Sequence, residues 1–429
     1  MSGPDRSLWA ATVGRRTLLG LMAAGAASSL TACTSPIDCD AGEPEFTGTG
    51  EIVFAAPPDF SFGRNREKAV RRWSQKNPGW EARYVPLPVP ADLQRTELLT
   101  KVQAEESDYD VLGLDVVWTA EFARGCFIVP LDSVADQLGT HRFLEPALDT
   151  AKYQERLWAV PMHTNAGLLY YRTDLVESPP NRWSDLPELI DHAGRDEGMD
   201  GYVGQLAHYE GLTVNVSEAV WGHGGELVED GRAVADRSEA IEGLKFLISG
   251  VQKGWIPRAA LDYNEERSRR RFQEGKALFL RNWPYAYELL SSEDSAVRDI
   301  FNAVQLPGPS ALGGMNLAIS RFSRKKATAL EFIKFLTSYD TQREVHVRGA
   351  YPAAISSVYE EPAVQAAQPY TAELERSVRT ARSRPTTPYY GQVTAAIQGA
   401  AHLAIEDGRE AASVMRHLVS DLEVALQGD

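Results

Sequence analysis

The stretch DVLGLD, residues 110–115, is an apolar run bounded by aspartates, and it predicts a buried β-strand. An earlier apolar run, EIVFAA at residues 51–56, predicts another strand. Between them, residues 64–76 and 92–105 carry apolar side chains at helical spacing. Strands and helices that alternate at this spacing are typical of a domain with a largely parallel sheet, so we expect an α/β fold.

The alternation continues along the rest of the 429-residue chain. Residues 167–171 predict a further strand, and the segments 241–251, 329–336 and 411–426 predict amphipathic helices. The chain is too long for one typical domain, and its 43% hydrophobic and 24% charged residues are usual for a protein with substantial cores. Because no obvious linker interrupts the middle, we expect two lobes that are joined by strands.

The first 32 residues have the pattern of an export signal peptide. Arg15 and Arg16 precede a mostly small and apolar run that ends at Ala32, and this run is too short to span a bilayer. The block LTAC at residues 30–33 resembles a bacterial lipobox, in which the cysteine, here Cys33, is acylated and becomes the mature N-terminus. The alternative is an ordinary signal peptide with a chance cysteine.

The paired arginines are similar to a twin-arginine export signal, but an ordinary Sec signal also carries basic residues, so both export routes stay open. Residues 33–49 are rich in Pro, Gly, Thr and acids, and they predict a flexible tether. We therefore expect a protein that is lipid-anchored at the extracytoplasmic face of the cell membrane. The net charge of −15 argues against a nucleic-acid partner.

Two cysteines remain once Cys33 is assigned to lipid. A disulfide between Cys39 and Cys126 would tie the tether to the first lobe. Against that, Cys126 begins the apolar run 126–129, where a buried free thiol is common, so both interpretations stay open. No paired Cys/His spacing suggests zinc, and we expect neither a metal nor another cofactor.

The segment FLRNWPYAY, residues 279–287, predicts the wall of a ligand site. Pro284 cannot donate to a sheet ladder, so the strand should end there and leave Trp283 and Tyr285 in a loop. Flat rings beside hydrogen-bonding groups suit a ligand that is apolar on its faces and polar at its edges. The alternative is that these rings fill a core.

Six segments, in order along the chain, resemble extracellular solute-binding proteins (family 1) of carbohydrate ABC importers, specifically the trehalose/maltose-binding type. They are GLDVVW at 113–118, AGLLYYRTDL at 166–175, YEGL at 209–212, RNWPY at 281–285, LGG at 312–314, and RP at 384–385 followed by PYY at 388–390. The resemblance implies a two-lobed, type II periplasmic-binding-protein-like fold whose lobes close over a sugar in the cleft between them. It also implies ABC permease subunits as partners, and we expect a monomer.

The expected lobe boundaries follow from the same resemblance. The first lobe is expected to hold residues 50–161 and 298–338, and the second lobe residues 162–297 and 339–429. The expected ligand-binding residues are Asp115, Asn165, Tyr209, Glu210, Trp283, Tyr285, Gly314, Met315 and Arg384.

The chemistry of these residues suits a sugar. Asp115 ends an apolar strand, where ligands of open α/β sheets collect, and its carboxylate can accept from two hydroxyls; its alternative role is a helix cap. The Asn165 amide can both donate and accept, whereas the family carries an aspartate there. Met315 replaces a family tryptophan and gives a softer contact. Arg384 matches an arginine that reaches sugar hydroxyls in the family; its alternative is a surface salt bridge.

Two other functions would use some of the same residues. An exported glycoside hydrolase would use two carboxylates, with Asp115 and either Glu121 or Glu210 as the pair. The same fold could instead bind a polyol or a glycerophosphodiester, but a phosphate would require clustered Arg and Lys, which the motifs lack. Because no convincing catalytic constellation accompanies the binding motifs, we expect a sugar-binding protein that is not an enzyme.

Overall fold

The computed structural model describes residues 44–193, 198–349 and 351–428. The expected signal peptide at 1–32, the lipidation site Cys33, most of the tether at 33–49, and Cys39 lie outside these residues. Within the described part of the chain, no helix is both long and apolar enough to cross a membrane.

The first sheet has the strand order β2-β1-β3-β13-β6. Its strands are β1 (Ile52–Ala56), β2 (Ala82–Pro86), β3 (Val111–Asp115), β6 (Val160–Ala166) and β13 (Leu312–Ile319). β1 pairs in parallel with β2 and β3, while β13 pairs antiparallel with both β3 and β6. All residues of β1 are buried, as the continuous apolar run predicts for a central strand covered on both faces.

Helices from distant parts of the chain cover this sheet. They are α1 (Asn65–Lys76), α2 (Ala91–Gln103), α3 (Thr119–Arg124), α4 (Ala135–Leu138), α5 (Glu145–Asp149), α11 (Lys326–Leu336) and α12 (Tyr339–Gly349). α1 packs against β2, α11 and α12. The ring of Phe332 on α11 lies 5.5 Å from that of Phe54 and 5.7 Å from that of Trp73, so β1, α1 and α11 share one aromatic core.

The second sheet has the strand order β12-β7-β11-β8. Its strands are β7 (Leu168–Arg172), β8 (Asp200–Val203), β11 (Ala277–Asn282) and β12 (Phe301–Gln305). The helices and hairpin strands along this part are α6 (Leu186–His192), α7 (Glu210–Gly222), β9 (Val228–Glu229), β10 (Arg232–Ala233), α8 (Ser238–Gln252), α9 (Glu265–Gln273) and α10 (Ala286–Leu290). The alternation of strands and helices predicted from the sequence is present in both sheets.

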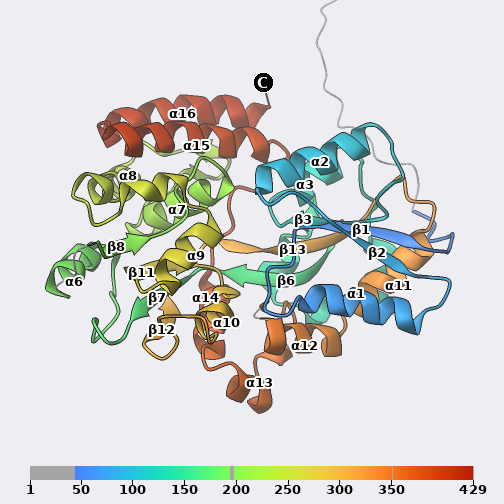
Figure 1. Cartoon of the computed structure of the whole chain (residues 1–429). Helices are drawn as coiled ribbons and strands as arrows, with labels where there is room; N and C mark the ends of the chain where they lie inside the picture. Colours follow the sequence, from blue (N-terminus) through green and yellow to red (C-terminus); the bar gives the residue numbers. More distant parts are fainter. Residues whose placement is uncertain (1–43, 194–197, 350, 429) are drawn as a thin grey trace, which may run out of the picture. The chain divides into compact units, whose positions relative to one another are not determined.

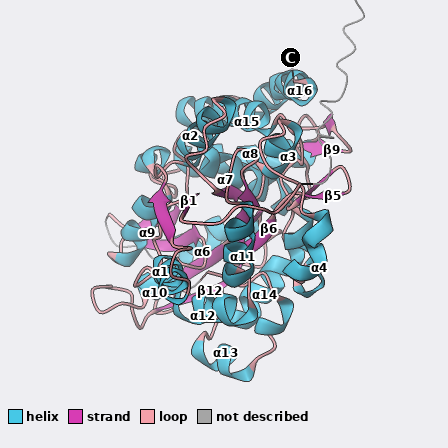
Figure 2. Cartoon of the chain, turned by 90° about the vertical axis from the view of Figure 1, so that its right-hand side faces the viewer, coloured by secondary structure: helices cyan, strands magenta, loops and turns pink. Residues whose placement is uncertain are grey.

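The remaining elements are β4 (Lys152–Tyr153), β5 (Arg156–Leu157), α13 (Pro362–Ala367), α14 (Thr371–Thr380), α15 (Tyr390–Asp407) and α16 (Ala411–Gln427). Figure 1 shows α15 and α16 side by side over α7 and α8, which they contact. Seen from the side, helices surround the strands of both sheets (Figure 2). The amphipathic C-terminal helix therefore covers the second sheet's helices, with Met415, Leu418 and Leu422 buried.

The chain passes between the sheets at Gly167, between β6 and β7, and at residues 306–311, between β12 and β13. Residues 381–389 form a third connection, which leads to α15 from α14, a helix that packs against both β6 and β12. Three lobe assignments from the sequence differ from the structure. Residues 163–166 of β6 were expected in the second lobe, yet they pair with β13 of the first sheet. β12 lies in the segment expected in the first lobe, yet it pairs with β7 of the second sheet. α12 was expected in the second lobe, yet it packs against α1 and α11. Hydrophobic periodicity identifies a strand or helix but not the sheet that it joins, because pairing depends on residues distant in the sequence.

Cys126 is a disulfide cysteine. The open choice between a bonded and a free thiol is thereby decided for this residue. The other two cysteines, Cys33 and Cys39, lie outside the described residues, so the pairing of Cys39 with Cys126 stays a prediction.

Candidate functional site

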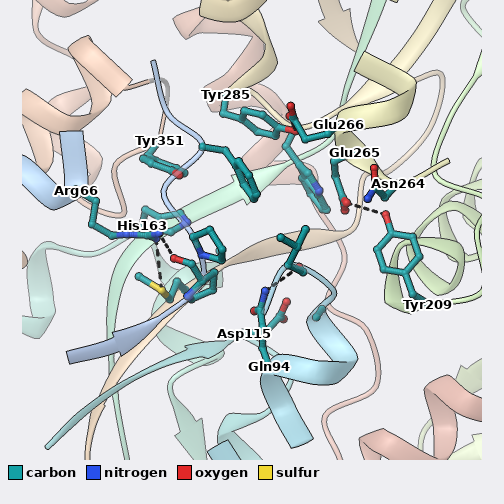
Figure 3. Close-up of a pocket in the computed structure, with 18 residues that line it drawn as sticks. Arg66, Gln94, Asp115, His163, Tyr209, Asn264, Glu265, Glu266, Tyr285 and Tyr351 are labelled. Carbon is teal, nitrogen blue, oxygen red and sulfur yellow. Dashed lines mark hydrogen bonds between the residues drawn. The ribbon is translucent and has the colours of Figure 1, made fainter. Parts of the chain in front are cut away.

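A pocket of about 200 Å³ lies where the carboxyl end of β3 faces the loop after β11 and the start of α9. Figure 3 shows Asp115 and Gln94 on one side of the pocket and Tyr285 with Glu266 on the other. The pocket brings together residues that are up to about 290 positions apart in the chain, because Pro57 and Tyr351 both line it.

An aromatic wall is built by the chain that follows β11. The side chain of Asn282, the last residue of β11, accepts from the backbone N–H of Trp283 at 2.8 Å. Its amide also donates to the carbonyl of Glu265 at 2.9 Å, which ties this turn to α9. The hydroxyl of Tyr170 donates to the carbonyl of Trp283 at 2.9 Å. These bonds fix the turn, and both Trp283 and Tyr285 line the pocket.

Two carboxylates at the start of α9 form the polar edge of this wall. Asn264 caps the helix by accepting from the N–H of Arg267 at 3.0 Å. Glu266 accepts from the Tyr285 hydroxyl at 2.7 Å and pairs with Arg269 at 2.9 Å. Although burial opposes ionisation, the bond and charge of Arg269 lower the pKa of Glu266, so this group is a carboxylate at neutral pH.

Glu265 is oriented by a neutral hydroxyl instead. Tyr209 donates to Oε2 of Glu265 at 2.7 Å (Figure 3). Burial raises the pKa of Tyr209 well above its usual value, so the hydroxyl keeps its proton and remains a donor. Among the described residues no cation lies within ion-pair distance of Glu265, which leaves its carboxylate available to hydrogen-bond donors in the pocket.

The opposite end of the pocket carries Arg66, His163 and Tyr351 (Figure 3). Arg66 is buried, donates to the carbonyl of Pro57, and has an Nε without a partner among the described residues. The rings of His163 and Tyr351 lie 4.9 Å apart. Burial, aided by the charge of Arg66, lowers the pKa of His163 to about 3. The imidazole is therefore neutral at physiological pH.

The backbone at position 314 requires glycine. Its φ is 128°, a region that L residues with a Cβ rarely adopt, and a Cβ there would lie 2.4 Å from the carbonyl oxygen of His163. β13 has a bulge immediately afterwards, between Met315 and Asn316. Gly314 and Met315 both line the pocket, so the bulge brings backbone and a flexible thioether to its floor.

A sequence model of bacterial extracellular solute-binding proteins matches residues 68–372, which is more than half of the chain. The chain belongs to the bacterial extracellular solute-binding protein family. The α/β periplasmic-binding-protein-like fold predicted from the sequence is confirmed by solved structures of such proteins. A solute-binding protein is not an enzyme, so the expectation of a non-catalytic protein also holds.

Three relatives illustrate the similarity. A probable ABC transporter-binding protein of Deinococcus radiodurans is 29% identical over 357 residues, which are 78% of this chain and 84% of the relative. The structure of maltose-bound T. maritima MalE3 matches with a TM-score of 0.82 and 32% identity, over 87% of this chain and 98% of that one. A solute-binding protein of Thermotoga lettingae bound to α-D-tagatose matches with a TM-score of 0.79 over 89% and 100%; at 20% identity it shows a shared fold alone.

Six of the expected ligand residues of this solute-binding protein line the pocket. They are Asp115, Tyr209, Trp283, Tyr285, Gly314 and Met315. Asn165 lies in β6 opposite Gly313 and does not belong to the lining, although its Oδ1 is buried without a partner among the described residues.

Glu210 and Arg384, expected to touch the solute, do not belong to the lining of this pocket. Arg384 is 3% exposed and donates to Glu210, so it does not form a surface salt bridge, and its contact with a ligand stays a prediction. Glu210 also accepts from the Tyr390 hydroxyl at 2.5 Å and from the Thr394 hydroxyl at 2.6 Å. Nη2 of Arg384 lies 3.3 Å from Oδ1 of Asp115, so this network supports a residue that does line the pocket.

The hydrolase alternative lacks a free pair of acids. Glu121 is paired with Arg95, and Glu210 with Arg384, so neither carboxylate is available beside Asp115. Among the described residues, no cluster of His, Cys, Asp and Glu could hold a metal ion.

Sequence reasoning missed the other end of the pocket and the start of α9. Arg66, Asn264, Glu265, Glu266 and Tyr351 all line the pocket. The sequence NEERSRRR at 264–271 carries a helix-start signal in its asparagine and two glutamates. That signal does not show whether the start of the helix faces the pocket.

Proposed function

We propose that this chain is the substrate-binding lipoprotein of an ABC sugar importer. It captures a di- or oligosaccharide of the trehalose or maltose kind by closure of its lobes, and it delivers the sugar to the transmembrane subunits of the permease. The observation that carries the proposal is the pairing of an aromatic wall, Trp283 and Tyr285, with carboxylates on both sides of one pocket. We expect the protein to act as a monomer.

The pocket chemistry suits a polyhydroxylated ring. The apolar C–H faces of a pyranose stack on the indole of Trp283 and the phenol of Tyr285. Its hydroxyls donate to Asp115 and Glu265, and a hydrogen bond to a charged group contributes about 1.5–3 kcal/mol. A sugar held in this way touches both lobes, and only such differential contact shifts the equilibrium toward closure.

The charge of the lining disfavours a phosphodiester. Asp115, Glu265 and Glu266 lie around the pocket, whereas Arg66 is the cation that faces it within the described residues. A phosphate group would have to approach three carboxylates with one guanidinium to bind, and like charges repel across a pocket of low dielectric. A neutral sugar or polyol meets no such repulsion.

The relatives support an importer and a sugar. The Deinococcus radiodurans relative is described as a probable ABC transporter-binding protein, and the T. maritima relative was solved with maltose. The lipid anchor at Cys33 is part of the proposal through its lipobox. Replacing Cys33 by Ala should release the protein from membranes or leave it unprocessed; a variant that still partitions with membranes like the wild type contradicts the anchor.

A calorimetric panel tests the ligand class. We expect trehalose, maltose or a longer glucan to bind, and glycerophosphocholine to fail. Trp283→Ala should weaken binding by about 2–4 kcal/mol, as for a buried aromatic hot spot, while Trp80→Ala, outside the pocket lining, should not. Tight binding of the phosphodiester alone, or an unchanged affinity in Trp283→Ala, contradicts the proposal.

A further inference from the structure

The indole of Trp283 lies against a buried guanidinium. Cζ of Arg281 is 4.0 Å from the ring centroid of Trp283, at cation–π distance. Arg281 is 1% exposed and absent from the pocket lining, whereas Trp283 belongs to it. A Cβ at Gly313 would lie 3.2 Å from the same indole, so the ring also lies against β13 of the first sheet. Trp283 therefore lies between the pocket and the elements that join the sheets.

Arg281 is held by Glu218 of α7. Nε and Nη2 donate to the two carboxylate oxygens at 2.7 and 2.6 Å, and Nη1 donates to Gln205 at 3.1 Å. The side chains of the ion pair are 1% and 2% exposed. A bidentate pair of this kind fixes the plane of the guanidinium, which is the surface beneath the indole.

Glu218 also accepts hydrogen bonds from segments that cross between the sheets. Its Oε1 accepts from the backbone N–H of Ala311 at 3.0 Å and from the Ser310 hydroxyl at 3.2 Å. The Ser310 hydroxyl accepts from the N–H of Gly167 at 2.5 Å, which brings the first crossing into the cluster. The N–H of Arg382 donates to the Ser310 carbonyl at 2.8 Å, which connects the third segment, residues 381–389, to the cluster. One carboxylate thus joins the crossings to Arg281.

We propose that Glu218 is a positioning residue that couples the stacking surface of Trp283 to the interlobe crossings. This inference rests on the proposed sugar-binding function. Closure changes the backbone of the crossings, and Glu218 transmits that change through Arg281 to the indole. Coupling free energies are reciprocal, so a sugar stacked on Trp283 favours the crossing geometry in which the cluster is intact.

A double-mutant cycle separates this coupling from a general effect on stability. Glu218→Gln keeps the volume of the side chain and removes its charge. We expect it to weaken sugar binding about tenfold, within the usual range for coupled sites. In a Trp283→Ala background it should weaken binding little further, because the coupled surface is already gone. Additive effects of the two changes overturn the proposal.

The matched control breaks another ion pair of the same lobe. Arg172 and Asp174 pair at 2.6 Å at the end of β7, away from the crossings. Asp174→Asn lowers stability through the loss of that pair, but its effect on binding should be additive with Trp283→Ala. Equal non-additivity in the control also overturns the proposal, because it indicates a global change of the lobe.

A measurement without sugar keeps this test separate from the proposed function. In protein labelled with 5-fluorotryptophan, the fluorine resonance of Trp283 is assigned with Trp283→Phe. Glu218→Gln should shift that resonance, and Asp174→Asn should leave it in place. If no sugar of the panel binds, the proposed function fails while this readout still decides the coupling.

Ser310→Ala is the second test variant, used if the Glu218→Gln protein does not fold. It removes the link from Gly167 through Ser310 to Glu218 and leaves the Arg281 ion pair intact. A shift of the Trp283 resonance in this variant supports the coupling. An unchanged resonance in every folded variant of the cluster overturns it.

Discussion

Nη2 of Arg384 lies 3.3 Å from Oδ1 of Asp115, so an arginine from the segment before α15 holds a carboxylate from the end of β3. Asp115 lines the pocket, and Arg384 lies behind it. The same guanidinium donates to Glu210 on α7. A charge buried at the junction of three segments therefore orients a residue that faces the pocket.

Arg384→Met should destabilise the protein by about 3–5 kcal/mol, because it leaves the buried carboxylate of Glu210 without its cation. Denaturation with urea measures the change. The comparison is Arg237→Met, which breaks an ion pair with Glu229 whose two side chains are about half exposed and should change the midpoint little. A midpoint for Arg384→Met equal to that of the comparison variant shows that the network does not contribute to stability.

Gly314→Ala should abolish solute binding and lower stability. The new Cβ would meet the His163 carbonyl at 2.4 Å in a backbone region that alanine rarely adopts, so the bulge in β13 has to move. Gly399→Ala is the matched control, because nothing lies within 4 Å of a Cβ at that position of α15, and alanine favours a helix by about 1 kcal/mol.

Both glycine variants are compared by thermal unfolding and by calorimetry with the sugar. A Gly314→Ala protein that binds as the wild type does would show that the close approach at the bulge is not required for the site.

The sequence predicts those residues of the pocket that a short motif identifies, and it misses those whose position depends on contacts with distant parts of the chain. Asp115 and Trp283 were found because Asp115 ends a strand and Trp283 directly follows one, each in a recognisable motif, and both line the pocket. The motif identified Arg384 but not its partners Glu210 and Asp115, because a motif match gives a residue's neighbours along the chain and not what lies across the fold. Glu265 was missed since its direction depends on the bond from Tyr209, 56 residues earlier.

The fold shows the same division. The strands β1, β3 and β7 follow from apolar runs, since burial on both faces leaves a local trace. The sequence does not predict which sheet β12 joins. Its place is set by antiparallel pairing with β7, which lies more than a hundred residues away in the chain.

His163 should make the protein sensitive to acid. Its folded pKa is about 3, because burial disfavours the imidazolium, while an unfolded histidine titrates near 6.5. The unfolded chain therefore binds the proton first, so this contribution to stability is complete above about pH 6.5 and is lost as the pH falls toward 3.

His163→Gln should reduce the slope of the unfolding free energy between about pH 6 and pH 4 by up to roughly 1.4 kcal/mol per pH unit, one proton's worth. Urea denaturation across this range measures the slope, with the exposed His417→Gln as control. The same slope in both variants contradicts a neutral buried His163.

A contact between the lobes at the rim of the pocket should slow release of the solute. Oδ2 of Asp92, in the first turn of α2, accepts from the backbone N–H of Glu210, the first residue of α7, at 3.1 Å. A carboxylate at a helix N-terminus contributes about 0.3–1 kcal/mol. Because Asp92 is not part of the lining, Asp92→Ala should raise the dissociation rate about two- to fivefold with little change in association. Stopped-flow fluorescence with the sugar measures both rates, and Glu97→Ala on the same helix, outside the lining, is the control. If Asp92→Ala releases the sugar no faster than Glu97→Ala, the contact between α2 and α7 does not hold the lobes together, and closure depends on the solute and the crossings alone.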